Sequence, residues 1–208
     1  MTVVLVPSKG LQGAKTRLSS MLSPQQRSLL TTDMLQAVLS AARNCSSVSR
    51  VIVVGAHPDT IDLARQAEAE WMAEAPSHAG DLRAIIDQSI ATLREQTSDS
   101  LLVLMADLPC VCVQDVNKLV EALQQNDVVL APDRHRSGTN ALGLAKGVQL
   151  TTCFGRSDSY QAHLDRIKSS GLSSTTVVTS GLELDIDTEM DFRDYVAARN
   201  SAAVVSRR

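Results

Sequence analysis

The sequence predicts a single α/β domain, in which a mostly parallel, twisted sheet carries helices on both faces in a Rossmann-like arrangement. Short apolar runs rich in β-branched residues alternate with amphipathic segments of ten or more residues. The chain has 208 residues, 44% of them hydrophobic and 21% charged, which is enough for one large core. It contains no internal repeat or linker. We therefore expect one domain over residues 1–197 and a frayed tail over residues 198–208.

Each element follows from its local pattern. A β-branched run directly after the first residue reads as a buried strand, and the pair Ser23-Pro24 is a helix N-cap followed by proline. Later apolar runs predict strands, and later segments with one apolar face predict helices. The expected strands are residues 2–7, 50–54, 70–75, 101–105, 128–131, 140–145 and 175–178. The expected helices are residues 24–43, 60–69, 80–96, 114–125 and 157–170, with a last helix beginning near residue 188.

Composition and charge exclude several classes of function. A formal net charge of −3 gives no general attraction to DNA or to anionic lipid. Aromatic residues make up only 2% of the chain, too few for a platform that stacks nucleic-acid bases. There is no signal segment and no apolar stretch of about 18 residues, so we expect no membrane association and a cytoplasmic protein. The oligomeric state stays open, a homodimer included.

The cysteines and histidines do not form a zinc site or a nucleophile-base pair. The four cysteines lack the paired spacing of a zinc ligand set, which favours a reduced protein. Cys110 and Cys112 are expected to be buried structural thiols, with no role assigned. His57, His78 and His163 are expected on the surface or in the core rather than as ligands.

In open α/β sheets, ligands bind outside the carboxyl ends of the strands. The loop at residues 8–20 follows the first strand and contains Lys9, Lys15 and Arg17 among glycines. Its spacing does not match a P-loop, because Ala14 separates Gly13 from Lys15. Three cations and flexible glycines still suit a polyphosphate, and the alternative is a solvated basic loop. The other loops expected at this edge are residues 106–109, 132–139 and 184–188.

Three aspartates in these loops suit a metal. Asp107 directly follows the apolar run LLVLM, and Mg²⁺ prefers one or two carboxylates together with phosphate oxygens. If the segment LELDIDTEMDF is extended, Asp185 and Asp187 face the same side, an arrangement that needs a cation between them. The alternatives are a turn at Asp107 and a helix start at Thr188 with a capping box to Asp191.

The segment APDRHRSGTNAL carries small and hydroxyl residues at a strand end, where they can donate hydrogen bonds to a carboxylate or a phosphate. The alternative is a hairpin loop. Taken together, PSKGLQGAKTRLSSMLSPQQR, LMADLP, LAPDRHRSGTNAL, SYQAHL and GLELDIDTEMD resemble the 2-phospho-L-lactate guanylyltransferase family, in that family's order. The resemblance implies a nucleotide-diphospho-sugar transferase-like fold, shared with the molybdenum-cofactor nucleotidyltransferases. It also implies a reaction of coenzyme F(420) biosynthesis, in which GTP and a phosphorylated three-carbon acid yield a guanosine diphospho-acid and pyrophosphate.

The resemblance further implies residue roles. Lys9, Lys15 and Arg17 would be the catalytic cations that bind the triphosphate. Three carboxylates would hold Mg²⁺, and five further residues would bind the substrates. The metal set is Asp107, Asp185 and Asp187, and the substrate-binding set is Thr139, Gly155, Ser159, Gly80 and Arg83.

The chain departs from the family pattern at two places. Arg83 stands where a Gly-Leu-Asn element would place asparagine, and the loop from Gly155 to Ser159 is one residue longer. The acid is left open among 2-phospho-L-lactate, phosphoenolpyruvate and 3-phosphoglycerate. Two other functions also stay open at this stage, a molybdenum-cofactor-type nucleotidyltransferase that uses CTP and a non-catalytic nucleotide-binding protein.

Overall fold

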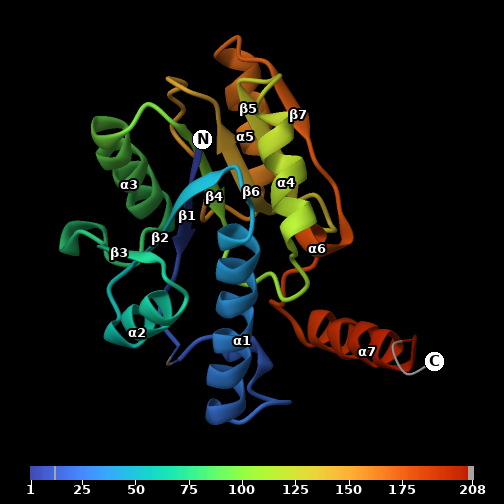
Figure 1. Ribbon diagram of the computed structural model, residues 1–208. Helices are drawn as coiled ribbons and strands as arrows, with labels where there is room; N and C mark the ends of the chain where they lie inside the picture. Colours follow the sequence, from blue (N-terminus) through green and yellow to red (C-terminus); the bar gives the residue numbers. More distant parts are fainter. Residues whose placement is uncertain (12, 206–208) are drawn as a thin grey trace.

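A seven-stranded sheet lies between two layers of helices (Figure 1). The computed structural model describes residues 1–11 and 13–205. The strand order is β3-β2-β1-β4-β6-β5-β7, and within the described chain only β6 runs antiparallel to its neighbours. The predicted fold class is confirmed.

The elements have the following bounds. The strands are β1 (Thr2–Pro7), β2 (Val48–Gly55), β3 (Glu70–Ala73), β4 (Ser100–Leu104), β5 (Val128–Pro132), β6 (Thr139–Leu144) and β7 (Ser174–Thr176). The helices are α1 (Pro24–Arg43), α2 (Pro58–Gln66), α3 (Leu82–Gln96), α4 (Val113–Ala122), α5 (Ser159–Ser169), α6 (Ser180–Glu183) and α7 (Glu189–Val205). Two 3-10 turns are η1 (Thr16–Leu18) and η2 (Pro76–His78).

The local signals place most elements well. Helix α1 has the predicted bounds, and Ser23 and Gln26 form a reciprocal capping box at its start. Helix α2 begins at Pro58, two residues before the expected start, because proline occupies its first position. The turn η1 lies inside the predicted loop 8–20, whose residue 12 is outside the described residues.

Three expectations need correction or completion. Residues 184–188 were expected directly after a strand, but the short helix α6 precedes them. The thiols of Cys110 and Cys112 were expected to be buried, yet Cys112 is exposed at the start of α4 and Cys110 is half-buried. Helix α7 continues to Val205, so the predicted tail lies partly in this helix and partly, at residues 206–208, outside the described residues.

Strand alternation divides the core into two layers. On β1, Val4 and Val6 pack with α1, α2 and α4, whereas Val3 and Leu5 pack with α3 and α5 on the opposite face. The same period of two on β2 and β4 gives each layer a continuous apolar floor. No helix in the described part of the chain has the length and apolar character needed to cross a membrane.

A third, smaller apolar cluster packs the loop at residues 8–20 and the segment before α7 against α1. Leu18 of the first loop, Met34 of α1, Ile186 and Tyr195 of α7 bury their side chains against one another. Helix α7 extends away from the sheet beside α1 (Figure 1). The cluster therefore anchors both the first loop and the segment before α7 to α1.

The ends of β1 and β2 approach so closely that only glycine fits at residue 55. A Cβ atom there would lie 2.3 Å from the backbone oxygen of Ser8, which begins the first loop. We predict that Gly55→Ala lowers the free energy of unfolding by about 1–3 kcal/mol, because the backbone itself must shift. Urea denaturation measures it. The exposed neighbour provides a control, since Ala56→Ser is expected to change stability by less than about 0.5 kcal/mol; equal stability of the two variants would contradict the close approach.

Candidate active site

The candidate site lies at the edge of the sheet where β1 and β4 end and β6 begins. Strands β1 and β4 are parallel, and β6 runs antiparallel to β4, so the first residues of β6 lie beside the carboxyl end of β4. A cleft of about 480 Å³ opens there. Its lining comes mainly from residues 7–10 and 13–17 of the first loop, residues 105–107 after β4, and Asp187. This volume falls in the range of small-molecule sites.

The three predicted metal-binding aspartates converge beside this cleft. Each of Asp107, Asp185 and Asp187 offers one carboxylate oxygen, and these oxygens lie within 4.8 Å of one another. Ile186 explains the convergence, because its side chain is fully buried and its backbone N–H donates to the Asp107 carbonyl oxygen. The aspartates on either side of it are therefore directed to the same place, although the segment forms no strand.

Lys15 joins the carboxylates. Its Nζ donates to Asp107 Oδ2 and to Asp187 Oδ1, each over 2.8 Å, and its side chain is only 12% exposed. Burial alone would lower the pKa of Lys15, but the charges and hydrogen bonds of the two aspartates outweigh it and raise this pKa above its ordinary value. Lys15 has a φ of 52°, a left-handed conformation that is unusual for a residue with a Cβ. Backbone strain of this kind is concentrated at functional sites.

Burial and the close approach of the three carboxylates raise the pKa of Asp185. Burial, followed by the negative charges of Asp107 and Asp187, raises its pKa to about 6. Asn140 partly offsets this effect by donating from Nδ2 to Asp185 Oδ1 over 3.4 Å. Near neutral pH, the site therefore holds three carboxylates against the single ammonium of Lys15.

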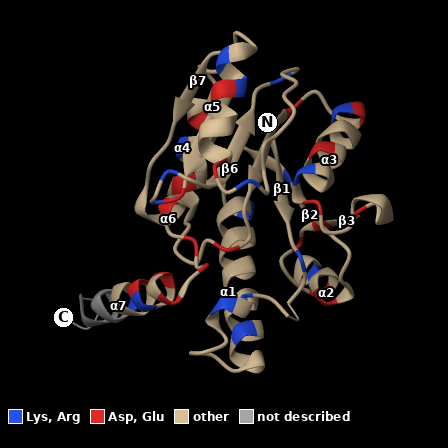
Figure 2. Ribbon diagram, turned by 180° about the vertical axis from the view of Figure 1, so that it is seen from behind, with Lys and Arg blue, Asp and Glu red and all other residues tan. Residues whose placement is uncertain are grey.

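A second set of bonds fixes the backbone at Asp187. Asp191 Oδ2 accepts from the backbone N–H groups of Asp187 and Thr188 and from the Thr188 hydroxyl, which completes the predicted capping box. Arg134, from the loop after β5, binds both Asp191 and Asp194. Acidic residues crowd the beginning of α7, next to the body of the protein (Figure 2). The predicted helix start is thus confirmed, and it also positions a site residue.

The segment after β5 is a hairpin, as the alternative reading expected. Pro132 pairs with Thr139 while Ala131 pairs with Ala141, so Asn140 is an extra residue that interrupts the register. Such an irregularity redirects side chains. Asn140 turns to the Leu182 carbonyl oxygen and to Asp185, while Thr139 turns to α5.

Thr139 and Ser159 contact each other and are not part of the cleft lining. Ser159 Oγ lies 3.3 Å from Thr139 Oγ1, and both residues are buried. Gly155, with a φ of 83°, lies in the loop before α5, and a Cβ there would lie 3.8 Å from Cβ of Leu82, which lines the cleft. Three of the predicted substrate-binding residues, Thr139, Gly155 and Ser159, therefore come from β6, α5 and the loop before α5.

The remaining predicted residues lie around the cleft. Lys9 and Arg17 are exposed and line it together with Lys15. Gly80 and the exposed Arg83 flank Leu82 at the start of α3 but are not part of the cleft lining. The structure brings the predicted cations and carboxylates together at the cleft, whereas Gly80 and Arg83 lie outside its lining.

Sequence reasoning assigned no role to Asn140 and Arg134, whose side chains hold the aspartate segment. His163 was expected on the surface or in the core, and it is buried. The spacing of Ser159 and His163 contained a usable signal, because residues four apart share one face of a helix. The partners of Asn140 and Arg134 depend on a register irregularity and on the placement of α7, which no local pattern specifies.

The donor set fits a hard divalent cation. Three carboxylate oxygens from two chain segments, with room in an adjoining cleft for phosphate oxygens, match the preferences of Mg²⁺. Three carboxylates so close together require positive charge, and Lys15 supplies only one unit of it. The residues present therefore suit a metal ion.

Comparison with known proteins gives consistent relatives. A family model described as "Guanylyl transferase CofC like" matches residues 2–201. The chain is 34% identical to the phosphoenolpyruvate guanylyltransferase of Chloroflexus aggregans, over 97% of this chain and 100% of that protein. It is 32% identical to the 3-phospho-D-glycerate guanylyltransferase of Phenylobacterium zucineum, over 99% and 96% of the two chains. It is 29% identical to the 2-phospho-L-lactate guanylyltransferase of Methanothermobacter thermautotrophicus, over 94% and 84%.

Solved structures show the same fold at low identity. A protein from Desulfovibrio desulfuricans G20, assigned to the nucleotide-diphospho-sugar transferases, has a TM-score of 0.74 at 16% identity, over 92% of this chain and 84% of that one. The 4-diphosphocytidyl-2C-methyl-D-erythritol synthase of Anaerococcus prevotii has a TM-score of 0.62 at 10% identity, over 96% of each chain. These likenesses bear on the fold alone, and they agree with the predicted one.

The raised pKa of Asp185 predicts that this carboxylate destabilises the metal-free protein. Between the ordinary pKa of aspartate and about 6, the folded state binds more protons than the unfolded state, so stability falls as pH rises through this window. We predict that Asp185→Asn raises the free energy of unfolding at pH 7.5 by at most about 3 kcal/mol and changes it much less at pH 4. Urea denaturation in EDTA measures both values.

The control for this prediction is Asp62→Asn, which removes an exposed carboxylate on α2. We expect it to change stability by less than about 0.5 kcal/mol at either pH. An Asp185→Asn variant that is no more stable than the wild type at pH 7.5 would show that the carboxylate is compensated in the folded protein.

Proposed function

The chain belongs to the family of CofC-like guanylyl transferases, which makes it a nucleotidyltransferase, and from this premise we propose its substrates and its mechanism. The proposed reaction transfers GMP from GTP to a phosphorylated three-carbon acid in the biosynthesis of coenzyme F(420). The main supporting observation is the cleft in which a cationic loop faces three convergent carboxylates. The names of the relatives supply the acids: phosphoenolpyruvate, 3-phosphoglycerate and 2-phospho-L-lactate.

The reaction needs alignment and charge neutralisation more than proton transfer. A phosphate oxygen of the acid attacks the α-phosphorus of GTP and forms a new P–O bond. The bond from the α-phosphorus to the bridging oxygen breaks, and pyrophosphate leaves with the electron pair. The attacking oxygen is already anionic at neutral pH, so no general base is required. This chemistry agrees with a cleft built from lysines, arginine and aspartates.

The proposed roles follow the placement of the charges. Lys9 and Arg17, exposed at the cleft, bind the triphosphate, and the glycines of the loop allow the backbone to approach it. Lys15 offsets part of the negative charge of Asp107 and Asp187, which keeps the carboxylates together before the substrates arrive.

The three aspartates are proposed to hold Mg²⁺. When bound, the ion would neutralise charge on the reacting phosphates. Around it, Asn140 orients the Asp185 carboxylate, and Asp191 fixes the backbone that carries Asp187. Mg²⁺ is proposed on the chemistry of the donors, since oxygen ligands and neighbouring phosphates suit it.

The acid is proposed to lie between the carboxylates and α5. Ser159 and Thr139 offer hydroxyl groups, and Gly155 offers a loop backbone without a side chain. Gly80 and Arg83 flank the other side, where Arg83 would contribute to guanine recognition by a polar contact. With few aromatic residues in the chain, backbone and polar groups would hold the base. A cytoplasmic location and a homodimer stay predictions from the sequence.

A panel of substrates tests this function. Each of GTP, CTP, ATP and UTP is incubated with each of the three acids and MgCl₂, and products are identified by mass together with released pyrophosphate. We predict that GTP with at least one acid yields the guanosine diphospho-acid, because the relatives share this reaction. Phosphoenolpyruvate is tried first, since the Chloroflexus relative is named for it. A preference for CTP, or no turnover of any acid, would contradict the proposal.

Substitution of the carboxylates tests the site within that assay. We predict that Asp187→Asn lowers the rate of pyrophosphate release at least about 100-fold, because an amide is a neutral and weaker ligand for a hard cation. Asp185→Asn is expected to do the same while the protein stays folded, as circular dichroism would verify. Asp62→Asn, on the exposed side of α2, serves as the matched control and should retain the wild-type rate. Full activity of either site variant would refute the metal assignment.

A further inference from the structure

A buried histidine lies directly behind the proposed acid site. His163, on α5, has no exposed surface and uses both ring nitrogens. Its Nε2 lies 2.7 Å from the backbone nitrogen of Cys153, and its Nδ1 lies 3.0 Å from Thr139 Oγ1. The mechanism described above does not use this residue.

The backbone partner determines which nitrogen of His163 carries the proton. A backbone N–H can only donate, so Nε2 of His163 accepts from Cys153 and carries no hydrogen. In a neutral imidazole the proton is then on Nδ1, and Nδ1–H donates to Thr139 Oγ1. The backbone N–H of Cys153 thus determines that His163 donates to Thr139 and does not accept from it.

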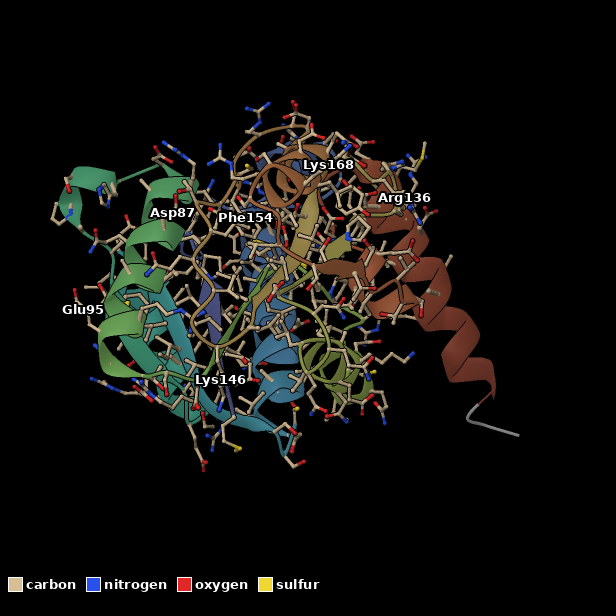
Figure 3. The ribbon with its side chains drawn as sticks, turned by 90° about the horizontal axis from the view of Figure 1, so that it is seen from above. Asp87, Glu95, Arg136, Lys146, Phe154 and Lys168 are labelled. Atoms are coloured by element: carbon tan, nitrogen blue, oxygen red, sulfur yellow. The ribbon has the colours of Figure 1, made fainter. Side chains whose placement is uncertain are left out.

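The surroundings keep the ring neutral. Phe154 meets the imidazole edge-on, with ring centroids 5.0 Å apart, and it lies between α3 and α5 (Figure 3). Burial lowers the pKa of His163 to about 4; a hydrogen bond with the Ser159 backbone opposes this shift, and the charge of Arg166 adds a smaller lowering. The imidazole therefore contributes hydrogen bonds but no charge.

The tautomer of His163 determines how the hydroxyl hydrogens of Thr139 and Ser159 can be used. Thr139 and Ser159 have two hydroxyl hydrogens between them, and their mutual bond of 3.3 Å uses one. Because Nδ1–H of His163 donates to Thr139, the hydrogen of Thr139 cannot turn toward the imidazole. These two bonds therefore use only one of the two hydroxyl hydrogens, and the other is the one that would donate to an anion.

We propose that His163 is a positioning residue for the acid substrate, holding the hydroxyl pair of Thr139 and Ser159 as a hydrogen-bond donor to the acid's carboxylate or phosphate. The inference rests on the proposed function, because the anion is the phosphorylated acid. An apolar side chain at this place would leave the Cys153 N–H without its partner, whereas His163 links α5 to two other segments, at Cys153 and at Thr139. Thr139 in turn contacts Ser159.

Two substitutions separate the two nitrogens. In His163→Gln the amide oxygen can reach the Nε2 position and accept from Cys153, but the bond to Thr139 is lost. In His163→Asn the amide nitrogen takes the Nδ1 position and donates to Thr139, but the bond to Cys153 is lost. Each variant gives up one buried hydrogen bond, so similar losses of stability are expected. Their effects on the acid substrate are expected to differ.

Steady-state kinetics provide the first test. We predict that His163→Gln raises KM for the acid about 10-fold and leaves KM for GTP and kcat within about threefold. We predict that His163→Asn restores most of the affinity for the acid. His135→Gln, at the exposed tip of the hairpin, is the matched control and should behave as the wild type. Equal KM values for the acid in the Gln and Asn variants would refute the positioning role.

Nuclear magnetic resonance of the imidazole nitrogens is the second test and requires no turnover. At pH 7 in the folded wild type, His163 should carry its proton on Nδ1, with Nε2 unprotonated. An Nε2–H tautomer or an imidazolium would overturn the assignment. A wild type that turns over none of the acids would contradict the proposed function and this role with it. If the wild type is active but the Gln and Asn variants have the same KM for the acid, only the proposed role of His163 is contradicted.

Discussion

The ion pairs of Lys15 with Asp107 and Asp187 are the interaction on which the site depends. The two aspartates lie 92 and 172 residues from Lys15 along the chain, so one ammonium group joins three distant segments. Without it, three carboxylate oxygens within 4.8 Å would repel one another in a partly buried place. The left-handed backbone of Lys15 and the raised pKa of Asp185 are two costs of this arrangement. A protein selected for stability alone would have neither, which supports a role in binding a cation.

The apolar core supplies the rigidity that the charges need. Ile186 is buried among side chains of α1, the first loop and α7, so the aspartates beside it cannot swing apart without opening that cluster. Asp191 and Arg134 add polar restraints from the other side. The short segment before α7 is therefore held from its apolar and its polar side, although it has no regular secondary structure. This explains how an irregular segment achieves the precision expected of a strand.

Sequence reasoning recovered what depends on local pattern. Helix α1, with its Ser23 cap, and the capping box at Thr188 are local signals, and both are confirmed. The convergence of Asp185 and Asp187 was anticipated from their spacing of two, and it occurs in a segment to which no strand is assigned. The role of Asn140 escaped because a register irregularity is a property of two paired strands. The resemblance to the guanylyltransferase family, drawn from the order of five motifs, is confirmed by the match over residues 2–201.

The proposed site would combine two different ways of binding anions. At the cleft, the cations and the proposed metal site would provide strong but weakly directional attraction, which suits a triphosphate with many equivalent oxygens. At α5, a neutral histidine and two hydroxyl groups provide direction without charge. A cationic residue at that second place would compete with Lys15 for the aspartates and disturb the balance of the cluster. In the proposed site, a neutral donor fixed by the backbone at Cys153 would avoid this competition, and geometry would then select the acid while charge would hold the phosphates.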